Sequence, residues 1–298
     1  MSGLTIGFLG LGKIGRPMAQ RLLEAGFDLA VYDLDAAAME SFAGQALLAH
    51  SAADLADRAD VVIACLQTAA QYRQAILGAD GVVHGKRAKA YIHLGTTGGA
   101  CVRELADGLA ASGMALLDAP VSGGVAGAAR GQLVTMVAGP LQVFEFARPC
   151  LDAWSRKVVY LGARPGLAQT MKLVNNMLSA ANLAVAAEVM VVGARAGIPA
   201  ATMLDVINHG TGQNHATLTK LPDNIVTRRF DCGSTLHNVV KDLSAYAEEA
   251  ASAGIESDVC QAVVRAFITA GEQSSLNDDL STVVRPHERA AGVELRAA

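Results

Sequence analysis

Up to about residue 160, short runs of aliphatic and β-branched residues alternate with longer segments whose apolar positions recur every three to four residues. The short runs predict buried strands, and the longer period predicts helices. Such alternation is typical of βαβ units around a parallel sheet. The predicted strands are Thr5–Leu9, Asp28–Tyr32, Val61–Cys65, Ala90–Leu94, Ala115–Asp118, Val134–Ala138 and Lys157–Tyr160, and the clearest predicted helices are Gly15–Ala25 and Val102–Ser112.

After Gly166 the strand-like runs nearly vanish, and helical segments rich in Ala, Leu and Met continue to the end of the chain. We therefore predict an α/β Rossmann-type N-terminal domain with a doubly wound, mostly parallel sheet, residues 1–163. An all-α domain for substrate binding and oligomerisation, residues 164–298, would follow it. Helix breaks are expected at Gly197–Pro199, Gly210–Gly212, Leu221–Pro222 and Gly254, and the polar tail after Arg285 is expected to be loosely held.

The segment from Leu173 to Ala194 is apolar and about long enough to span a bilayer. It carries three asparagines and Glu188, which are costly in lipid but ordinary inside a globular protein. We interpret it as the buried core helix of the second domain. Because so much apolar surface is hard to cover with one small helical domain, we also expect a homodimer or homotetramer.

Composition narrows the class of partner. The 298 residues carry a formal net charge of -4, which offers no basic surface for nucleic acid or an anionic membrane. The five cysteines form no Cys-x-x-Cys pair and the seven histidines no His-Glu-x-x-His, so neither disulfides nor a metal site are expected. The N-terminus has no secretory pattern, and we expect a cytoplasmic protein with a small-molecule partner.

A glycine-rich turn lies between the first strand and the first helix: Gly10-Leu11-Gly12-Lys13-Ile14-Gly15. Glycines in this G-x-G-x-x-G pattern let backbone N–H groups approach a pyrophosphate, and the helix N-terminus adds partial positive charge. Asp33 ends the next strand, where a carboxylate accepts hydrogen bonds from ribose hydroxyls and repels a 2′-phosphate. The sequence predicts NAD as the preferred cofactor, with NADP as the alternative because Lys13 and Arg16 lie nearby.

Four segments together resemble the β-hydroxyacid dehydrogenases, the family of 3-hydroxyisobutyrate dehydrogenase and tartronate semialdehyde reductase. The resemblance covers essentially the whole chain. It implies an active site in a cleft between two domains and hydride transfer between a nicotinamide and a small 3-hydroxy acid or its semialdehyde. The segments are Gly10 to Ala19, Asp118-Ala119-Pro120-Val121-Ser122-Gly123-Gly124, Lys172-Leu173-Val174-Asn175-Asn176 and Lys241-Asp242-Leu243.

Lys172 and Asn176 lie four residues apart on the predicted long helix, so both project from one face. A lysine that loses hydration is easier to deprotonate, which suits proton transfer. The resemblance implies that Lys172 takes the hydroxyl proton as hydride leaves the substrate, and that Asn176 orients the substrate. Asn175 is expected beside it in the substrate site.

Ser122, Gly123 and Gly124 follow a strand, where a hydroxyl and backbone N–H groups can form a pocket for a carboxylate. Lys241 resembles the family lysine that lies close to both substrate and nicotinamide.

Leu66 and Thr96 stand at cofactor positions of the family, although the sequence departs from the pattern around both. Gln67 replaces a common proline, Gly95 and Gly99 replace the serine and proline of a Ser-Thr-x-x-Pro turn, and Ile14 replaces a frequent methionine.

Two alternatives remain at this point. An imine reductase would share the two-domain plan, but usually carries a different proton donor at the position of Lys172. A non-catalytic dinucleotide-binding scaffold would not need Lys172, Asn176 and Ser122 together. The sequence leaves open which hydroxy acid is used and in which direction the reaction runs.

Overall fold

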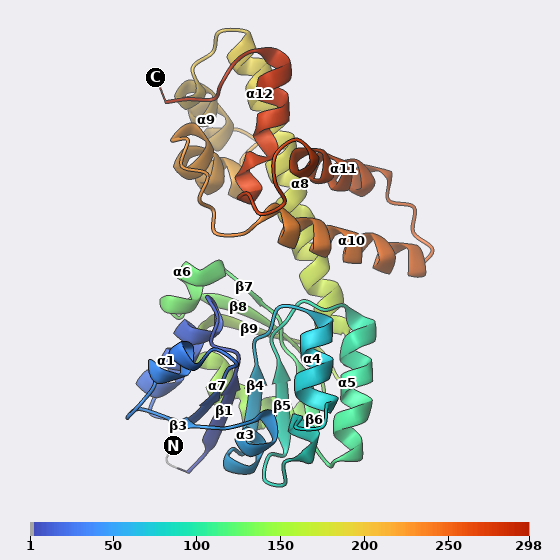
Figure 1. Cartoon of the computed structure of the whole chain (residues 1–298). Helices are drawn as coiled ribbons and strands as arrows, with labels where there is room; N and C mark the ends of the chain where they lie inside the picture. Colours follow the sequence, from blue (N-terminus) through green and yellow to red (C-terminus); the bar gives the residue numbers. More distant parts are fainter. Residues whose placement is uncertain (1–2, 298) are drawn as a thin grey trace. The chain divides into compact units, whose positions relative to one another are not determined.

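The computed structural model describes residues 3–297, and the chain divides into two compact units, residues 1–172 and 173–298 (Figure 1). The division falls inside the long helix α8, Leu167–Arg195. The boundary expected at residues 163 and 164 lies just before this helix and stays a prediction.

The first unit is built on one sheet whose central strands all run parallel. Its order β3-β2-β1-β4-β5-β6 is that of a Rossmann fold, which confirms the predicted doubly wound sheet. Beyond β6, strand β8 runs antiparallel to β6 and β7, and β9 pairs parallel with β8. The strands are β1 Thr5–Leu9, β2 Asp28–Tyr32, β3 Leu47–Leu48, β4 Val61–Ala64, β5 Ala90–His93, β6 Ala115–Asp118, β7 Val121–Ser122, β8 Leu133–Ala138 and β9 Ser155–Gly162.

Helices cover both faces of this sheet (Figure 1). Side chains from α1, α6 and α7 join one core with Ile6 and Phe8 of β1, whereas α3, α4 and α5 join the other core with Leu9. Burial on both faces explains why the strands read as unbroken apolar runs. The helices are α1 Gly15–Glu24, α2 Ala36–Glu40, α3 Ala52–Arg58, α4 Ala69–Leu77, the short 3-10 helix η1 Val82–His84, α5 Gly99–Ala111, α6 Gly124–Ala129 and α7 Leu141–Asp152.

The second unit is helical and packs around α8. Leu183 and Met190 of α8 share a core with Leu221 and Phe267. Pro199 precedes the first residue of α9, and α10 ends just before Gly254, as expected. The further elements are α9 Ala200–His209, η2 Ala216–Val226, α10 Leu236–Ser252, α11 Asp258–Glu272, η3 Leu280–Val284 and α12 Arg285–Ala291.

The break expected at Leu221–Pro222 is wrong, because η2 runs through Pro222 without interruption. In an α-helix the proline ring would clash with the carbonyl four residues earlier and remove one hydrogen bond. Here the segment is a π-helix, whose wider turn moves that carbonyl away from the ring. Leu221 therefore stays fully buried in the core of the second unit.

Helix α8 is long and apolar enough to cross a membrane by length and composition alone, and 44% of its most apolar window is buried inside the fold. Leu183, Ala187 and Met190 are buried, as expected of a core helix. The opposite face is exposed, however, with Leu178 at 61% and Val192 at 67%. The interpretation as a buried helix holds for one face of α8 only.

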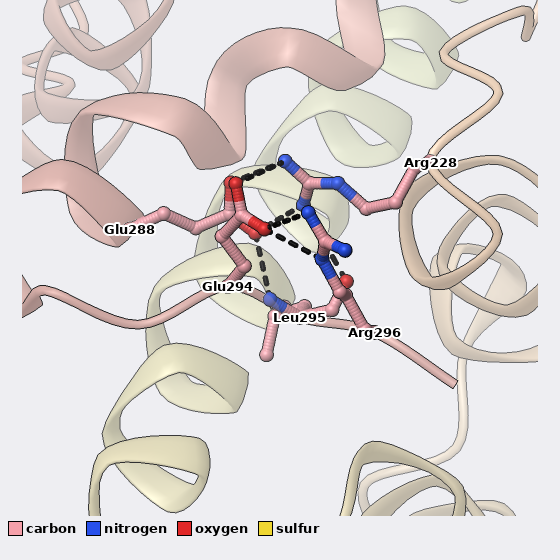
Figure 2. Close-up of polar contacts among 5 residues, drawn as sticks. All are labelled: Arg228, Glu288, Glu294, Leu295 and Arg296. Atoms are coloured by element: carbon pink, nitrogen blue, oxygen red, sulfur yellow. Dashed lines mark hydrogen bonds and ion pairs between the residues drawn. The ribbon is translucent and has the colours of Figure 1, made fainter. Parts of the chain in front are cut away.

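The polar tail is held firmly, contrary to expectation. Glu288 is buried and receives both arms of the Arg228 guanidinium, while the backbone N–H of Leu295 donates to Glu288 Oε1 at 2.8 Å (Figure 2). Leu295 itself is fully buried, and the N–H of Ala297 donates to Val226 O. One carboxylate thus ties α12 to the tail and to the end of η2.

This anchor predicts a difference between two neighbouring glutamates. Glu288→Ala removes the acceptor of Arg228 and of a buried N–H group, so we expect the free energy of unfolding to fall by about 3 kcal/mol. Glu294 is half exposed, pairs with Arg296 and lies 3.8 Å from Arg228, so Glu294→Ala should cost less than about 1 kcal/mol because these ion pairs are partly solvated. Urea denaturation of both variants measures the difference, and equal midpoints would contradict it.

Candidate functional site

Four candidate segments meet at one edge of the sheet in the first unit. The glycine turn follows β1, Leu66 follows β4, Thr96 follows β5, and Ser122 comes shortly after β6. Because these four strands are parallel neighbours in the order β1-β4-β5-β6, their carboxyl ends share an edge. This is the edge at which open α/β sheets bind their ligands.

The three motif glycines meet different surroundings. A Cβ at Gly10 would lie 2.4 Å from the carbonyl oxygen of Cys65, and one at Gly15 would lie 2.0 Å from that of Gly10. A Cβ at Gly12 would have nothing within 4 Å. Gly10 and Gly15 are therefore needed for packing within the protein, whereas Gly12 leaves open the space that a pyrophosphate needs.

A hollow of about 380 Å³ lies against this turn. Beside it, Asp33 Oδ2 accepts a hydrogen bond from the N–H of Leu11 at 2.6 Å, and Oδ1 accepts one from the N–H of Asp35. Asp33 thus ties the end of β2 to the glycine turn. The hollow is lined by two cations, one carboxylate and residues of the glycine turn at the start of α1, a position that suits a dinucleotide: Leu11, Gly12, Lys13, Arg16, Pro17, Asp35, Ala37 and Ala38.

The turn with Thr96 connects β5 to α5, and Thr96 is half-buried. A Cβ at Gly95 would lie 2.4 Å from the ring of the buried Tyr72, which explains why a glycine stands where the family has serine. The Tyr72 hydroxyl accepts from the N–H of Leu66 and donates to Ala64 O. Tyr72 therefore fixes the end of β4 by hydrogen bonds and packs against His93 at the end of β5.

Ser122 is half-buried in β7, opposite Val134 of β8. The next two residues, Gly123 and Gly124, have φ of 136° and 66°, which other residues rarely adopt. A Cβ at Gly123 would also lie 2.9 Å from the side chain of Leu133. The two glycines therefore allow a sharp turn that leads from Ser122 into α6.

Lys172 is half-buried and is the last residue of the first unit. Asn175 and Asn176 continue α8 in the second unit, where the Asn176 amide donates to Asp242 Oδ2 at 2.7 Å. The ammonium nitrogen of Lys241 lies 3.1 Å from Asp242 Oδ1. Asp242 thus holds Asn176 of α8 and Lys241 of α10 together.

Sequence reasoning missed Gln169, which is fully buried in α8 one turn before Lys172. Its side-chain N–H group donates to Asp118 Oδ1 at 2.7 Å, and burial raises the pKa of Asp118 to about 6 although hydrogen bonds partly oppose this. The missed signal was its position: Gln169 precedes Lys172 by three residues and therefore shares its face of the helix.

Lys220 was missed as well. It lies in η2, donates to Ser179 Oγ at 3.1 Å, and burial lowers its pKa.

A larger hollow of about 760 Å³ lies beside the C-terminal tail. It is framed by the ion pairs that hold the tail, and none of the candidate residues lines it. Its lining residues are Arg228, Arg285, Glu288, Arg289, Gly292, Val293, Glu294 and Arg296. Within residues 3–297, no group of three or more His, Cys, Asp or Glu side chains is placed to hold a metal ion.

Family models match both parts of the chain. The NAD binding domain of 6-phosphogluconate dehydrogenase matches residues 5–162, and the NAD-binding domain of NADP-dependent 3-hydroxyisobutyrate dehydrogenase matches residues 166–287. The chain belongs to the β-hydroxyacid dehydrogenase family. As a member of this family it is an NAD(P)-dependent oxidoreductase, and the expected nicotinamide cofactor is confirmed at that level.

Relatives in this family match along nearly the whole chain. An L-threonate dehydrogenase of Escherichia coli K12 is 31% identical over 287 residues, covering 95% of each chain. An NAD-dependent L-serine dehydrogenase of Pseudomonas aeruginosa is 35% identical and covers 85% of this chain and 87% of its own. Among solved structures, 3-hydroxyisobutyrate dehydrogenase of Mycobacterium tuberculosis with L-serine has a TM-score of 0.85 at 30% identity, covering 95% and 98%.

An imine reductase of Streptomyces aurantiacus shares the fold of this family member, with a TM-score of 0.64 at 20% identity and coverage of 95% of this chain and 99% of its own.

The glycine geometry predicts that two similar substitutions separate binding from stability. Gly12→Ala adds a methyl group in open space, so the urea midpoint should not change while the Kd for NADH rises at least about tenfold. Gly15→Ala forces the turn apart and should lower the free energy of unfolding by about 2 kcal/mol or more. Fluorescence titration with NADH and urea denaturation test both, and unchanged NADH binding in Gly12→Ala would contradict the assignment.

Proposed function

We propose that this chain is an NAD-preferring dehydrogenase of small 3-hydroxy acids, or equally a reductase of their semialdehydes. The observation that carries the proposal is that Lys172 and Ser122 belong to the same compact unit as a glycine turn with open space at Gly12. Proton transfer, carboxylate binding and cofactor binding thus have candidate residues in one folded body.

When bound, the nicotinamide supplies the hydride acceptor in oxidation and the hydride donor in reduction. The neutral amine of Lys172 takes the proton of the substrate hydroxyl as the carbon–hydrogen bond breaks, and the resulting ammonium returns it in the reverse reaction. The Ser122 hydroxyl and the N–H groups of Gly123 and Gly124 hold the carboxylate. Asn176, fixed by Asp242, orients the substrate together with Asn175 and Lys241.

The names of the relatives support this substrate class. L-Threonate, L-serine and 3-hydroxyisobutyrate are small carboxylates that each carry a hydroxyl group on carbon 3. Retention of Lys172 and Asn176 argues against an imine reductase, and the complete set of candidate residues argues against a non-catalytic scaffold. The physiological substrate lies within this class of 3-hydroxy acids.

Asp33 supports NAD as the preferred cofactor. Its carboxylate lies against the glycine turn, held by the N–H of Leu11, at the end of β2 where adenosine ribose binds in Rossmann folds. A 2′-phosphate there would meet this negative charge, although Lys13 and Arg16 line the same hollow. Leu66 and Thr96, which follow neighbouring strands, would contact the nicotinamide half.

We also propose that the enzyme works in the cytoplasm without a nucleic-acid or membrane partner. The formal net charge of -4 supports this, as does burial of one face of α8 in the core of the second unit.

The proton-transfer role is tested by Lys172→Ala and Lys172→Arg. General acid–base catalysis contributes about 10²- to 10⁴-fold, so we expect kcat to fall by that factor in both variants while NADH binding changes little. Initial rates are measured with L-serine, 3-hydroxyisobutyrate, glycerate and threonate, each with NAD and NADP. Lys89→Ala, at the amino edge of the sheet, is the matched control. Normal turnover of Lys172→Ala would refute the assignment, and an inactive parent protein across the panel would refute the proposed function.

The exposed face of α8 supports a homodimer or homotetramer. Leu178, Val185 and Val192 follow one another at intervals of seven residues and are 61%, 56% and 67% exposed, with Val189 beside them at 50%. Apolar residues at this interval form one stripe along a helix, which suits packing against the same stripe of a second copy.

Two glutamate variants test this association. Val185→Glu places a charge in the middle of the stripe and should shift the protein toward monomer by at least about tenfold in dissociation constant. Val259→Glu alters a residue of α11 that is 77% exposed and should leave the assembly unchanged. Analytical ultracentrifugation measures both, and a parent protein that is monomeric at micromolar concentration would contradict the proposal.

A further inference from the structure

The side-chain amide of Gln169 uses its full hydrogen-bonding capacity inside the first unit. Its nitrogen donates to Asp118 Oδ1 at 2.7 Å and to Gly95 O at 2.9 Å. Its oxygen accepts from the N–H of Thr97 at 2.9 Å and from that of Gly98 at 3.1 Å. Two N–H bonds and two lone pairs are what a primary amide offers, so this fully buried group has no capacity left over.

Asp118 completes the arrangement from the end of β6. It is fully buried, and its second oxygen accepts from the backbone N–H groups of Gly166 and Gln169, at 3.0 and 3.1 Å. Gly166 directly precedes α8 and Gln169 lies in its first turn, where N–H donors have no partner within the helix. The aspartate therefore fixes where α8 starts relative to the sheet.

Three parts of the candidate site are joined by these bonds. Gln169 holds the turn from Gly95 to Gly98, which contains Thr96, and Asp118 holds the first turn of α8. Lys172 follows Gln169 by three residues on the same helix and therefore lies on the same face, about one turn further along. All of these bonds join residues of the first unit.

The polar side chains that lie beside this cluster on β5 and α4 are uncharged. His93 is fully buried, its Nε2 lies 3.0 Å from Thr97 Oγ1, and burial lowers its pKa to about 3. Tyr72 packs against the His93 ring at 4.0 Å between centroids, and burial raises the pKa of the Tyr72 hydroxyl. Because both groups are uncharged, neither competes with Gln169 for the Asp118 carboxylate.

We propose that Gln169, clasped to Asp118, is the positioning residue of the active site, holding the Thr96 turn and Lys172 in one fixed geometry. This rests on the proposed function, since it assigns these two parts to cofactor and proton transfer. Hydride transfer tolerates little error in such a geometry, because a displacement of about 1 Å can cost about a hundredfold in rate. Gln169 itself touches neither substrate nor cofactor in this proposal.

The sharpest single variant is Gln169→Glu, which has the same length. An ionised side chain still accepts from Thr97 and Gly98, but it donates neither to Asp118 nor to Gly95 O, and it repels Asp118 at 2.7 Å whenever both carboxyl groups are ionised. We expect kcat to fall about a hundredfold with KM within about threefold, and the deuterium isotope effect of the substrate to increase as hydride transfer becomes limiting. In protein without cofactor, amide exchange should accelerate together in residues 95–98 and 166–172.

The double variant Asp118→Asn/Gln169→Glu restores a donor and an acceptor with their positions exchanged. An asparagine at 118 can accept from Gly166 and Gln169 N–H groups through its oxygen and donate to the glutamate at 169 through its amide. The bond to Gly95 O stays lost, so we expect recovery to within about tenfold of the parent kcat. A role in stability alone would not produce this pattern of loss and recovery.

Asp60→Asn is the matched control. Asp60 also accepts from a backbone N–H, that of Thr5 at 2.9 Å, and from Arg87, but it lies before β4 at the amino edge of the sheet. It should lower the urea midpoint and leave kcat and the isotope effect unchanged.

Gln169→Asn, one methylene shorter, serves if Gln169→Glu fails to fold. Either Gln169 variant with kcat within about threefold of the parent and an unchanged isotope effect would overturn the positioning role alone. An inactive parent protein would overturn the proposed function and this inference with it.

Discussion

The parallel run of β1, β4, β5 and β6 is the constraint on which the rest of the first unit depends. Both faces of this sheet are covered by helices, so backbone groups can meet a ligand only where the strands end. Gly12 and Ser122, which are distant in sequence, therefore lie at the same edge of the sheet although they need not contact each other. Variation in the turns at that edge can change the chemistry while the sheet is preserved.

The same type of hydrogen bond, from a side-chain amide of α8 to an aspartate, occurs in both units. Gln169 donates to Asp118 in the first unit, and seven residues later Asn176 donates to Asp242 in the second. Lys172 lies between these two amides, and a spacing of three and four residues places all three side chains on one face of the helix. In each unit a carboxylate thus accepts a hydrogen bond from a side chain of α8, one before and one after the candidate proton-transfer residue.

Much of this could be predicted from the sequence. Strands β1, β2 and β6 have the predicted bounds, because a buried strand needs only a short apolar run between polar turns, and the pattern states this directly. The glycine turn could be predicted because its G-x-G-x-x-G pattern lies directly between a strand and a helix in the sequence. Pro222 was misjudged because the rule for proline assumes an α-helix, and only tertiary packing around Leu221 selects the wider π-helix.

The expectation for the tail is wrong, and Gln169 was missed, because both are held by hydrogen-bond partners that are distant in sequence. Leu295 is buried through Glu288 and Arg228, and the Arg228 and Leu295 positions are 67 residues apart. Gln169 bonds residues more than 70 positions earlier in the chain. A local pattern records that a residue is polar, but not which distant group satisfies its hydrogen bonds. The roles of the site residues stay predictions, since they concern a substrate rather than the fold.

The buried carboxylate of Asp118 also has a thermodynamic consequence. Its pKa of about 6 in the folded protein lies above the ordinary value of 3.8, so the folded state binds the proton more tightly than the unfolded chain does. Stability therefore declines as pH rises from about 4 to about 6, and near neutrality the ionised group costs the fold about 3 kcal/mol. A protein selected for stability alone would replace such a group with an apolar one. Asp118 thus gives up part of the stability of the fold in exchange for a fixed connection between the end of β6 and the start of α8.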